Sequence, residues 1–310
     1  MKKPELYISA GSAEQARAYI EAGADAVAVG EHRYAMRMPG EVKLDDLAGL
    51  IPWAHERGAR VYVVVNKIMD NDLLPELPAY LRRLKELQAD AVVFGDPAVL
   101  IALRQASAQG LPLHWNAEMT STNYETAGYW RSKGAVRVVL ARELNLEETL
   151  GIKRNLPSME VEVQVHGITN IYHSKRSLLK NYQEHQGRAE LRGSGIEEGL
   201  FLIEQERQDE RYPVYEDVNG THIMSSDDIC MLEDLHELMA GNIDSFRIES
   251  LLKPEAYNVT VIQGYRQAID AYCADPEGYE FQEEWIEAIR RLQDPRRELS
   301  FGFFYKEQVY

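Results

Sequence analysis

Short apolar segments of strand length recur eight times along the chain, and helical patterns separate most of them. Most of these segments are rich in valine or isoleucine, as is typical of a strand buried on both faces. The eight predicted strands are 5–10, 25–30, 60–66, 90–94, 112–116, 135–140, 160–166 and 244–249. This alternation is the pattern of a (β/α)8 TIM-like barrel. An open, doubly wound parallel sheet is the alternative.

The segments between these strands carry helical spacing and recognisable start signals. Ser12 with acidic Glu14, Asp96-Pro97 and Lys253-Pro254 are each typical of a helix N-terminus. The predicted helices are 13–22, 44–57, 76–88, 98–108, 123–133, 146–154 and 254–272.

Residues 168–242 interrupt the alternation. They contain a predicted helix around 176–185 and two or three short strands within 200–224, with Asn219-Gly220 as a hairpin signal. We therefore expect the chain to have four parts, one of which is a small antiparallel insert that lies on the barrel mouth. They are 1–167 with barrel strands one to seven, the insert 168–242, the last barrel strand and helix in 243–274, and a C-terminal helix with a docked tail in 275–310.

The composition favours a protein of the reducing cytoplasm. Two cysteines, Cys230 and Cys273, are too few for a disulfide framework. The N-terminus enters a strand pattern directly, and no apolar run reaches the length of a membrane span, so we expect no membrane association. The net charge of −16 disfavours a generic basic surface for nucleic acid.

Polar side chains stand at the ends of the predicted strands, where a barrel gathers its catalytic groups. They are Ser12, Arg33, Arg37, Asn66, Asp96, Asn116, Glu118, Arg142, Glu143, His166 and Glu249. Together they would form a ring of carboxylates, amides and guanidinium groups at one mouth. Such a ring suits a small anionic or polar ligand.

Several members of this ring have a structural interpretation as well. His166 can be a hydrogen-bonded core histidine, Arg142 and Glu143 can form an ion pair, and Ser12 and Asp96 can be helix caps. Asn66 and Asn116 end otherwise apolar strands, where an amide has little structural purpose, so a binding role is favoured for them.

A basic cluster follows the seventh strand. Lys175, Arg176 and Lys180 alternate with Tyr172, His173 and Tyr182. Cations interleaved with aromatic rings are typical of an anion or RNA contact, and a solvated helix face is the alternative. The common phosphate-loop, dinucleotide, zinc-protease and serine-hydrolase motifs are absent from the sequence, and neither cysteine has the surroundings of a nucleophile.

Longer stretches resemble the U32 "collagenase-like peptidase" family over nearly the whole chain. They include ELYISAGSAEQARAYIEAGADAVAVG, ADAVVFGDPAVL, VEVQVHG, RSLLKNY and SSDDICMLEDLHELMAGNIDSFRIES. The resemblance implies four cysteines that hold an iron–sulfur cluster. Here the first two positions are Asn170 and Ser177, no cysteine occurs between 183 and 229, and only Cys230 matches. Because such a cluster takes four thiolates, we expect none bound by this chain alone.

In this respect the chain resembles the cluster-less, P1-type member of paired Bacillus-type tRNA modification proteins. That resemblance implies prephenate-dependent formation of 5-hydroxyuridine at the wobble position, with a paralogue that carries the cluster cysteines and with tRNA as partner. Peptidase activity and a non-catalytic scaffold role are the alternatives.

The resemblance also suggests roles for the candidate residues. Catalytic roles fall to His166, Glu143 and Glu249, which would orient polar groups or move protons. Substrate binding falls to a second set, in which the arginines would hold the carboxylates of the donor acid. That set is Arg37, Asn66, Asn116, Glu118, Arg142, Arg176 and Tyr182.

Overall fold

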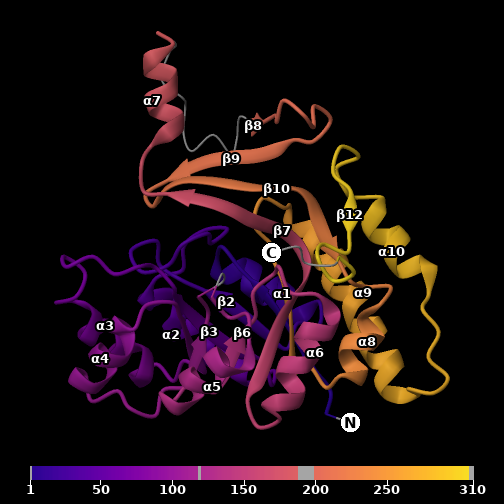
Figure 1. Ribbon diagram of the computed structural model, residues 1–310. Helices are drawn as coiled ribbons and strands as arrows, with labels where there is room; N and C mark the ends of the chain where they lie inside the picture. Colours follow the sequence, from indigo (N-terminus) through magenta and orange to yellow (C-terminus); the bar gives the residue numbers. More distant parts are fainter. Residues whose placement is uncertain (1, 118–119, 188–198, 307–310) are drawn as a thin grey trace.

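Eight parallel strands close into a barrel in the computed structural model, which describes residues 2–117, 120–187 and 199–306 (Figure 1). The strands are β1 (Glu5–Ser9), β2 (Ala26–Val29), β3 (Arg60–Val65), β4 (Ala91–Phe94), β5 (Leu113–Trp115), β6 (Arg137–Val139), β7 (Glu160–Ser174) and β11 (Ser245–Ile248). Each pairs with the next, and β11 pairs with both β7 and β1. The closure confirms the predicted (β/α)8 barrel and makes the open sheet wrong.

Helices between the strands form the outer layer, as predicted. They are α1 (Ala13–Glu21), α2 (Leu44–His55), α3 (Leu77–Glu86), α4 (Ala98–Gln105), α5 (Tyr124–Ser132), α6 (Leu146–Asn155), α8 (Leu235–Ala240) and α9 (Glu255–Ala274). Several begin at a capping side chain: Ser12 accepts from the Gln15 amide, and Asn145 forms a capping box with Glu148. None of the helices among the described residues is long and apolar enough to cross a membrane.

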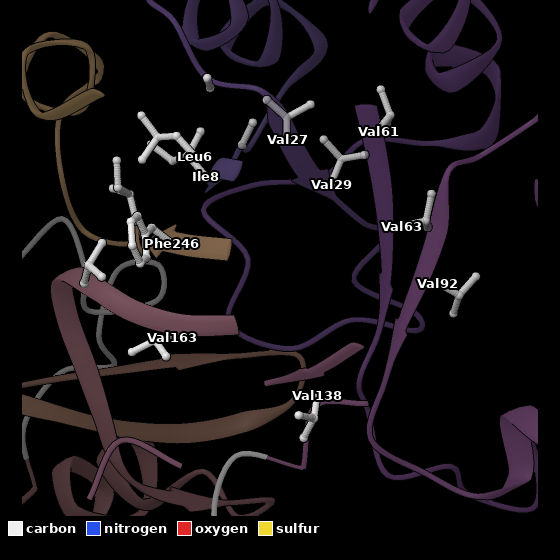
Figure 2. Close-up of a cluster of buried hydrophobic side chains, with 14 of the residues drawn as sticks. Leu6, Ile8, Val27, Val29, Val61, Val63, Val92, Val138, Val163 and Phe246 are labelled. Atoms are coloured by element: carbon white, nitrogen blue, oxygen red, sulfur yellow. The ribbon is translucent and has the colours of Figure 1, made fainter. Parts of the chain in front are cut away.

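Alternate residues of each strand divide into two apolar layers. Outward-facing side chains such as Leu6, Val27 and Phe246 pack against the helices and form the main core (Figure 2). Inward-facing alanines such as Ala26 and Ala91 leave room inside the barrel for Tyr62. The barrel axis therefore has space for polar side chains, which matters for the site.

Strand β7 does not end at the barrel rim. It continues to Ser174 and pairs antiparallel with β10 (Gly220–Cys230), which pairs with β9 (Tyr212–Asp217), which pairs with β8 (Phe201–Leu202). We call this sheet, with α7 (Leu178–His185), the extension. It confirms the predicted antiparallel insert and its hairpin, where Gly220 has φ +111° after a two-residue loop. The expected boundary at residue 167 falls inside one continuous strand.

The extension lies over the barrel mouth, with α7 projecting away from the body (Figure 1). Its far end is held to the loops after β2 and β3: the Asn219 side chain donates to the Ala35 carbonyl at 3.3 Å, and Lys175 pairs with Asp70 at 2.6 Å. An apolar cluster of Ile168, Tyr215, Met224 and Leu251 packs between the sheet and the rim.

The C-terminal segment supports the base of the extension. Helix α10 (Glu283–Arg290) packs on α9, and β12 (Leu299–Ser300) pairs with β10. Phe304 is buried in the main core. The described C-terminal residues thus form one helix and a segment that packs against the main core. Cys230 ends strand β10, because the chain stays extended there to pair with β7.

Candidate functional site at the barrel mouth

A small cavity of about 30 Å³ lies where the barrel strands end beneath the extension. Five of the predicted site residues line it together: Arg37, Asn66, Asn116, Arg142 and Glu249. They come from the ends of five different strands or the loops that follow them, so barrel closure brings them together. The cavity has room for about two water molecules.

Two amide oxygens in the cavity wall have no hydrogen-bond donor among the described residues. They are Oδ1 of Asn116, which is only 5% exposed, and Oδ1 of Asn170 in the extension. A buried carbonyl oxygen without a donor costs about 1–3 kcal/mol. By contrast, Oδ1 of Asn66 accepts from the Met36 amide at 2.8 Å and holds the loop after β2. Asn116 and Asn170 are therefore the amides suited to an N–H group of a ligand.

The carboxylate at the mouth is held in place by a serine hydroxyl group. Ser9 Oγ donates to Glu249 at 3.0 Å and lies 2.9 Å from Ser250 Oγ. Arg247 Nη1 lies 4.0 Å from Glu249, and its Nη2 donates to Gln164 at 3.1 Å. The mouth thus combines one oriented carboxylate with three guanidinium groups, those of Arg37, Arg142 and Arg247.

Tyr7 and Arg247 line the cavity but were not among the predicted site residues. Both lie within strands rather than at their ends. Burial raises the pKa of Tyr7 well above its ordinary value, so its hydroxyl stays protonated at neutral pH. The sequence did contain a signal that could have identified them, because each is a charged or phenolic side chain in the middle of a strand that is buried on both faces.

His166 faces away from the cavity because of a β-bulge. The register of β7 against β11 shifts between Arg247 and Ile248, so His166 pairs with outward-facing Ile248. Its Nε2 lies 2.9 Å from the Tyr257 hydroxyl of α9, and it is fully buried. Burial lowers the pKa of His166 to about 3, so the imidazole is neutral at neutral pH. Its contacts are those of a positioning residue.

The other predicted residues lie apart from the mouth cavity. Glu143, Arg176 and Tyr182 are exposed and do not line it, and Glu118 lies outside the described residues. Asp96 accepts from the Ala98 and Met69 amides, as a cap does. Arg33 pairs with Glu76 on the surface.

The residues at the family's cluster positions do not meet around one point. Asn170 faces the mouth cavity, whereas Cys230 is buried opposite His166 in the main core. Burial raises the pKa of the Cys230 thiol to about 11, which disfavours a thiolate ligand. No group of three potential metal ligands occurs in the described part of the chain. This donor set does not fit an iron–sulfur cluster.

Comparison with known proteins matches residues 11–309 to Peptidase family U32. The chain belongs to this family. This U32 chain is 48% identical to tRNA hydroxylation protein P2 of Bacillus subtilis, over the full length of both. It is 30% identical to tRNA hydroxylation protein P1 of the same organism, covering 100% of this chain and 74% of the relative. The greater similarity is thus to P2 and not to the P1 type.

More distant relatives carry related names. The tRNA hydroxylation protein P of Escherichia coli is 29% identical, over 94% of this chain and 73% of that protein. Two of the three relatives are a pair from one organism.

Proposed function

We propose that this U32 chain takes part in prephenate-dependent conversion of wobble uridine to 5-hydroxyuridine in tRNA, acting in the cytoplasm with a cysteine-containing paralogue. The mouth cavity is the observation that carries the proposal. It combines three guanidinium groups with two amide oxygens that have no donor in the described part of the chain. Guanidinium groups bind carboxylates in bidentate geometry, and an amide oxygen can accept from the imide N–H of a uracil ring.

Each part of the mouth then has a chemical task. Arg37 and Arg142 attract the carboxylates of the acid, while Asn116 and Asn170 orient the base. Glu249, fixed by Ser9, is the group placed to hold or move a proton at the mouth. The neutral imidazole of His166 contributes indirectly, because its contact with Tyr257 fixes β7 to α9. An iron–sulfur cluster, if the reaction needs one, belongs to the paralogue.

The extension supplies a separate surface for tRNA. Helix α7 has no buried residue, Tyr182 within it is 54% exposed, and Arg176 in the segment before it is exposed. Exposed aromatic rings beside cations favour contact with unpaired bases and phosphates. Because the whole chain carries a net charge of −16, the paralogue would provide the remaining RNA contact.

Removing the gene tests the proposal directly. tRNA from a strain that lacks this gene and its paralogue should contain little or no 5-hydroxyuridine by mass spectrometry. Undiminished 5-hydroxyuridine in that strain contradicts the proposal. Complementation with an Arg37→Gln/Arg142→Gln variant should fail, while Arg83→Gln, a surface arginine paired with Glu86, should restore the modification.

The same variants separate an active subunit from a scaffold. If the Arg37→Gln/Arg142→Gln protein still co-purifies with the paralogue and fully supports modification, this chain is a scaffold. The peptidase alternative gains no support from the mouth, because its hydroxyl Ser9 donates to Glu249 and the nearby imidazole of His166 faces the core. Cleavage of peptides by the purified chain, lost on Ser9→Ala, would revive it.

A further inference from the structure

The mouth cavity is too small for the kind of ligand that its walls favour. It measures about 30 Å³, whereas small-molecule pockets usually measure about 300–1,000 Å³. A pyrimidine ring is several times larger than a water molecule, so it cannot enter unless a wall moves. The barrel forms one part of the wall, and the extension forms the other through Ile168, Asn170 and Met224.

The extension is the part of the wall that can move. Each of the eight barrel strands is paired on both sides in a closed ring, so widening the barrel would break strand pairs. The extension lies over the mouth (Figure 1). It continues from the barrel through β7 and is held to this strand by the pairing of β7 with β10.

The pairing of β7 with β10 is interrupted at the rim of the mouth. Asn170 pairs with Met224. The next pair joins Ile168 to Asp228, so residues 225–227 lie opposite a single residue of β7. A bulge of this kind bends a sheet and interrupts its ladder of hydrogen bonds. We call the part of the extension beyond the bulge the lid, which consists of 170–174, α7, β8, β9 and 220–224.

The bulge is firmly held on the side of the barrel. Asp228 is fully buried and pairs with Lys253 at 2.5 Å and with Arg297 at 2.8 Å. Arg297 also donates to the carbonyl oxygens of Ser225 at 3.1 Å and of Asp227 at 2.9 Å. The bulge is thus anchored at one end, as a hinge requires.

The lid itself is one body. The rings of His173, His222 and Tyr215 stack across three of its strands, with centroids 4.7 and 4.8 Å apart. Helix α7 is tied to the same sheet, because the Glu216 carboxylate accepts from the Leu179 amide at 2.6 Å. A movement at the bulge would therefore carry the sheet and the helix together.

The lid rests on the rim between two cavities. The mouth cavity lies on one side of Ile168, and a cavity of about 400 Å³ lies on the other, between β8, β9 and the start of α9. At the far end, Lys175 pairs with Asp70, and both side chains are about half exposed. An exposed ion pair contributes little to stability. Opening the lid should therefore need much less free energy than unfolding the barrel.

We infer that the lid swings about the bulge, admits a ligand to the mouth and then closes over it. The inference deepens the proposed function and rests on it, because it takes the mouth as the binding site. Asn170 moves with the lid, whereas Asn116 stays with the barrel. The two amides that face the ligand are therefore brought together when the lid closes, and closure keeps water from the reacting groups.

Cysteine labelling of the purified full-length chain tests the inference. Val64→Cys places a thiol in the mouth, because Val64 lines the cavity and is 5% exposed. A Cys273→Ser background leaves Cys230, buried in the main core, as the internal reference. Iodoacetamide should modify the thiol at position 64 at least tenfold faster than Cys230, since the lid opens while the barrel stays folded. Mass spectrometry measures both rates, each divided by its value in urea-unfolded protein.

A cross-link across the mouth gives the decisive comparison. Asp70→Cys/Lys175→Cys, added to the labelling variant, allows a short bis-maleimide with a disulfide in its spacer to join the lid to the rim. Both positions are exposed, so a brief treatment suffices. The locked protein should lose at least tenfold in the labelling rate at position 64, and reduction of the spacer should restore it. Each single cysteine variant, treated in the same way, should be labelled at least as fast as the starting protein.

Weakening the contact at the far end gives a second measurement. Lys175→Gln should raise the labelling rate at position 64 by a few-fold, because it removes the ion pair with Asp70. Arg83→Gln removes a surface ion pair with Glu86 and should leave the rate unchanged.

Two results overturn the inference. Labelling at position 64 that is as slow as that of Cys230 would show that the mouth does not open, and labelling that the cross-link does not slow would show that the lid is not the route. If circular dichroism shows that Val64→Cys does not fold, Asn116→Cys replaces it, at another buried position of the lining. Neither tRNA nor a donor acid enters the measurement, so its failure is distinct from a failure of the proposed function in the deletion strain.

Discussion

The two ends of the barrel interior are both charged, yet they are built in opposite ways. At the amino-terminal end, Arg137 is 1% exposed and pairs with Glu5 at 2.6 Å, Glu160 at 2.8 Å and Glu162 at 3.3 Å. At the mouth, amide oxygens of Asn116 and Asn170 have no donor among the described residues. One end pairs its buried guanidinium with three carboxylates of the same chain, whereas the other leaves hydrogen-bonding capacity for a ligand. The difference indicates which end serves stability and which serves binding.

The largest effect is expected from Arg137→Met at the closed end. It leaves the buried carboxylates of Glu5 and Glu162 without their main cation, and breaking a buried pair in this way costs about 3–5 kcal/mol. The free energy of unfolding from urea titration measures it. Arg83→Met, on the surface, is the control and should change stability by less than about 1 kcal/mol. Equal effects of the two substitutions would remove the contrast.

Gly167→Ala should have the next largest effect, at the rim of the mouth. Gly167 has φ +98°, and a Cβ there would lie 2.3 Å from the Glu249 carbonyl oxygen. Backbone strain and the forced displacement together should cost about 2–4 kcal/mol. Gly58→Ala is a useful control, because that glycine also has a positive φ but nothing lies within 4 Å of the added Cβ. A similar loss for both would assign the effect to backbone conformation alone.

The buried imidazole of His166, which lies behind the mouth, should make the free energy of unfolding depend on pH. Its pKa is about 3 when folded and about 6.5 when unfolded, so between these values the unfolded chain binds more protons. Stability from this group is present above pH 6.5 and falls with decreasing pH, by at most about 1.4 kcal/mol per unit. His166→Gln should flatten the dependence, and exposed His185→Gln should not. An unchanged slope in His166→Gln would contradict the low pKa.

The smallest stability effect is expected from Asn116→Leu at the mouth. The substitution removes a buried acceptor for which residues 2–117, 120–187 and 199–306 provide no donor, so stability should stay within about 1 kcal/mol of the unsubstituted protein. The level of 5-hydroxyuridine in complemented cells should nevertheless fall. A loss of stability comparable to that of Arg137→Met would show that Asn116 supports the fold and would weaken its assignment as a ligand acceptor.

The barrel could be predicted from the sequence because each strand is a local signal. Runs such as Arg60–Val65 and Ala91–Phe94 are apolar on both faces, and the pattern needs no long-range information. The five residues that meet at the mouth followed from one geometric rule about strand ends. These parts depend on chain order and periodicity alone.

The bulge at His166 and the length of β7 could not be predicted in this way. The bulge depends on how β7 pairs with β11, about eighty residues later in the chain, and it turns a strand-end histidine away from the mouth. The segment beyond Gly167 alternates weakly, so its continuation as a strand depends on pairing with β10. Arg247 and Tyr7 were missed because the sequence indicates that a charged or phenolic side chain within such a strand is buried. It does not indicate whether that side chain faces the mouth.

The pairing of β1 with β11 has a consequence for how this protein is made. β1 ends at Ser9 and its second barrel partner begins at Ser245, so ring closure joins the first and last barrel strands. During synthesis β1 has one edge without its native partner until most of the chain, including the whole extension, has left the ribosome. An exposed strand edge is prone to wrong pairing and aggregation. Closure across so long a loop is also slow, so the yield of folded protein should depend strongly on the expression temperature and on chaperones.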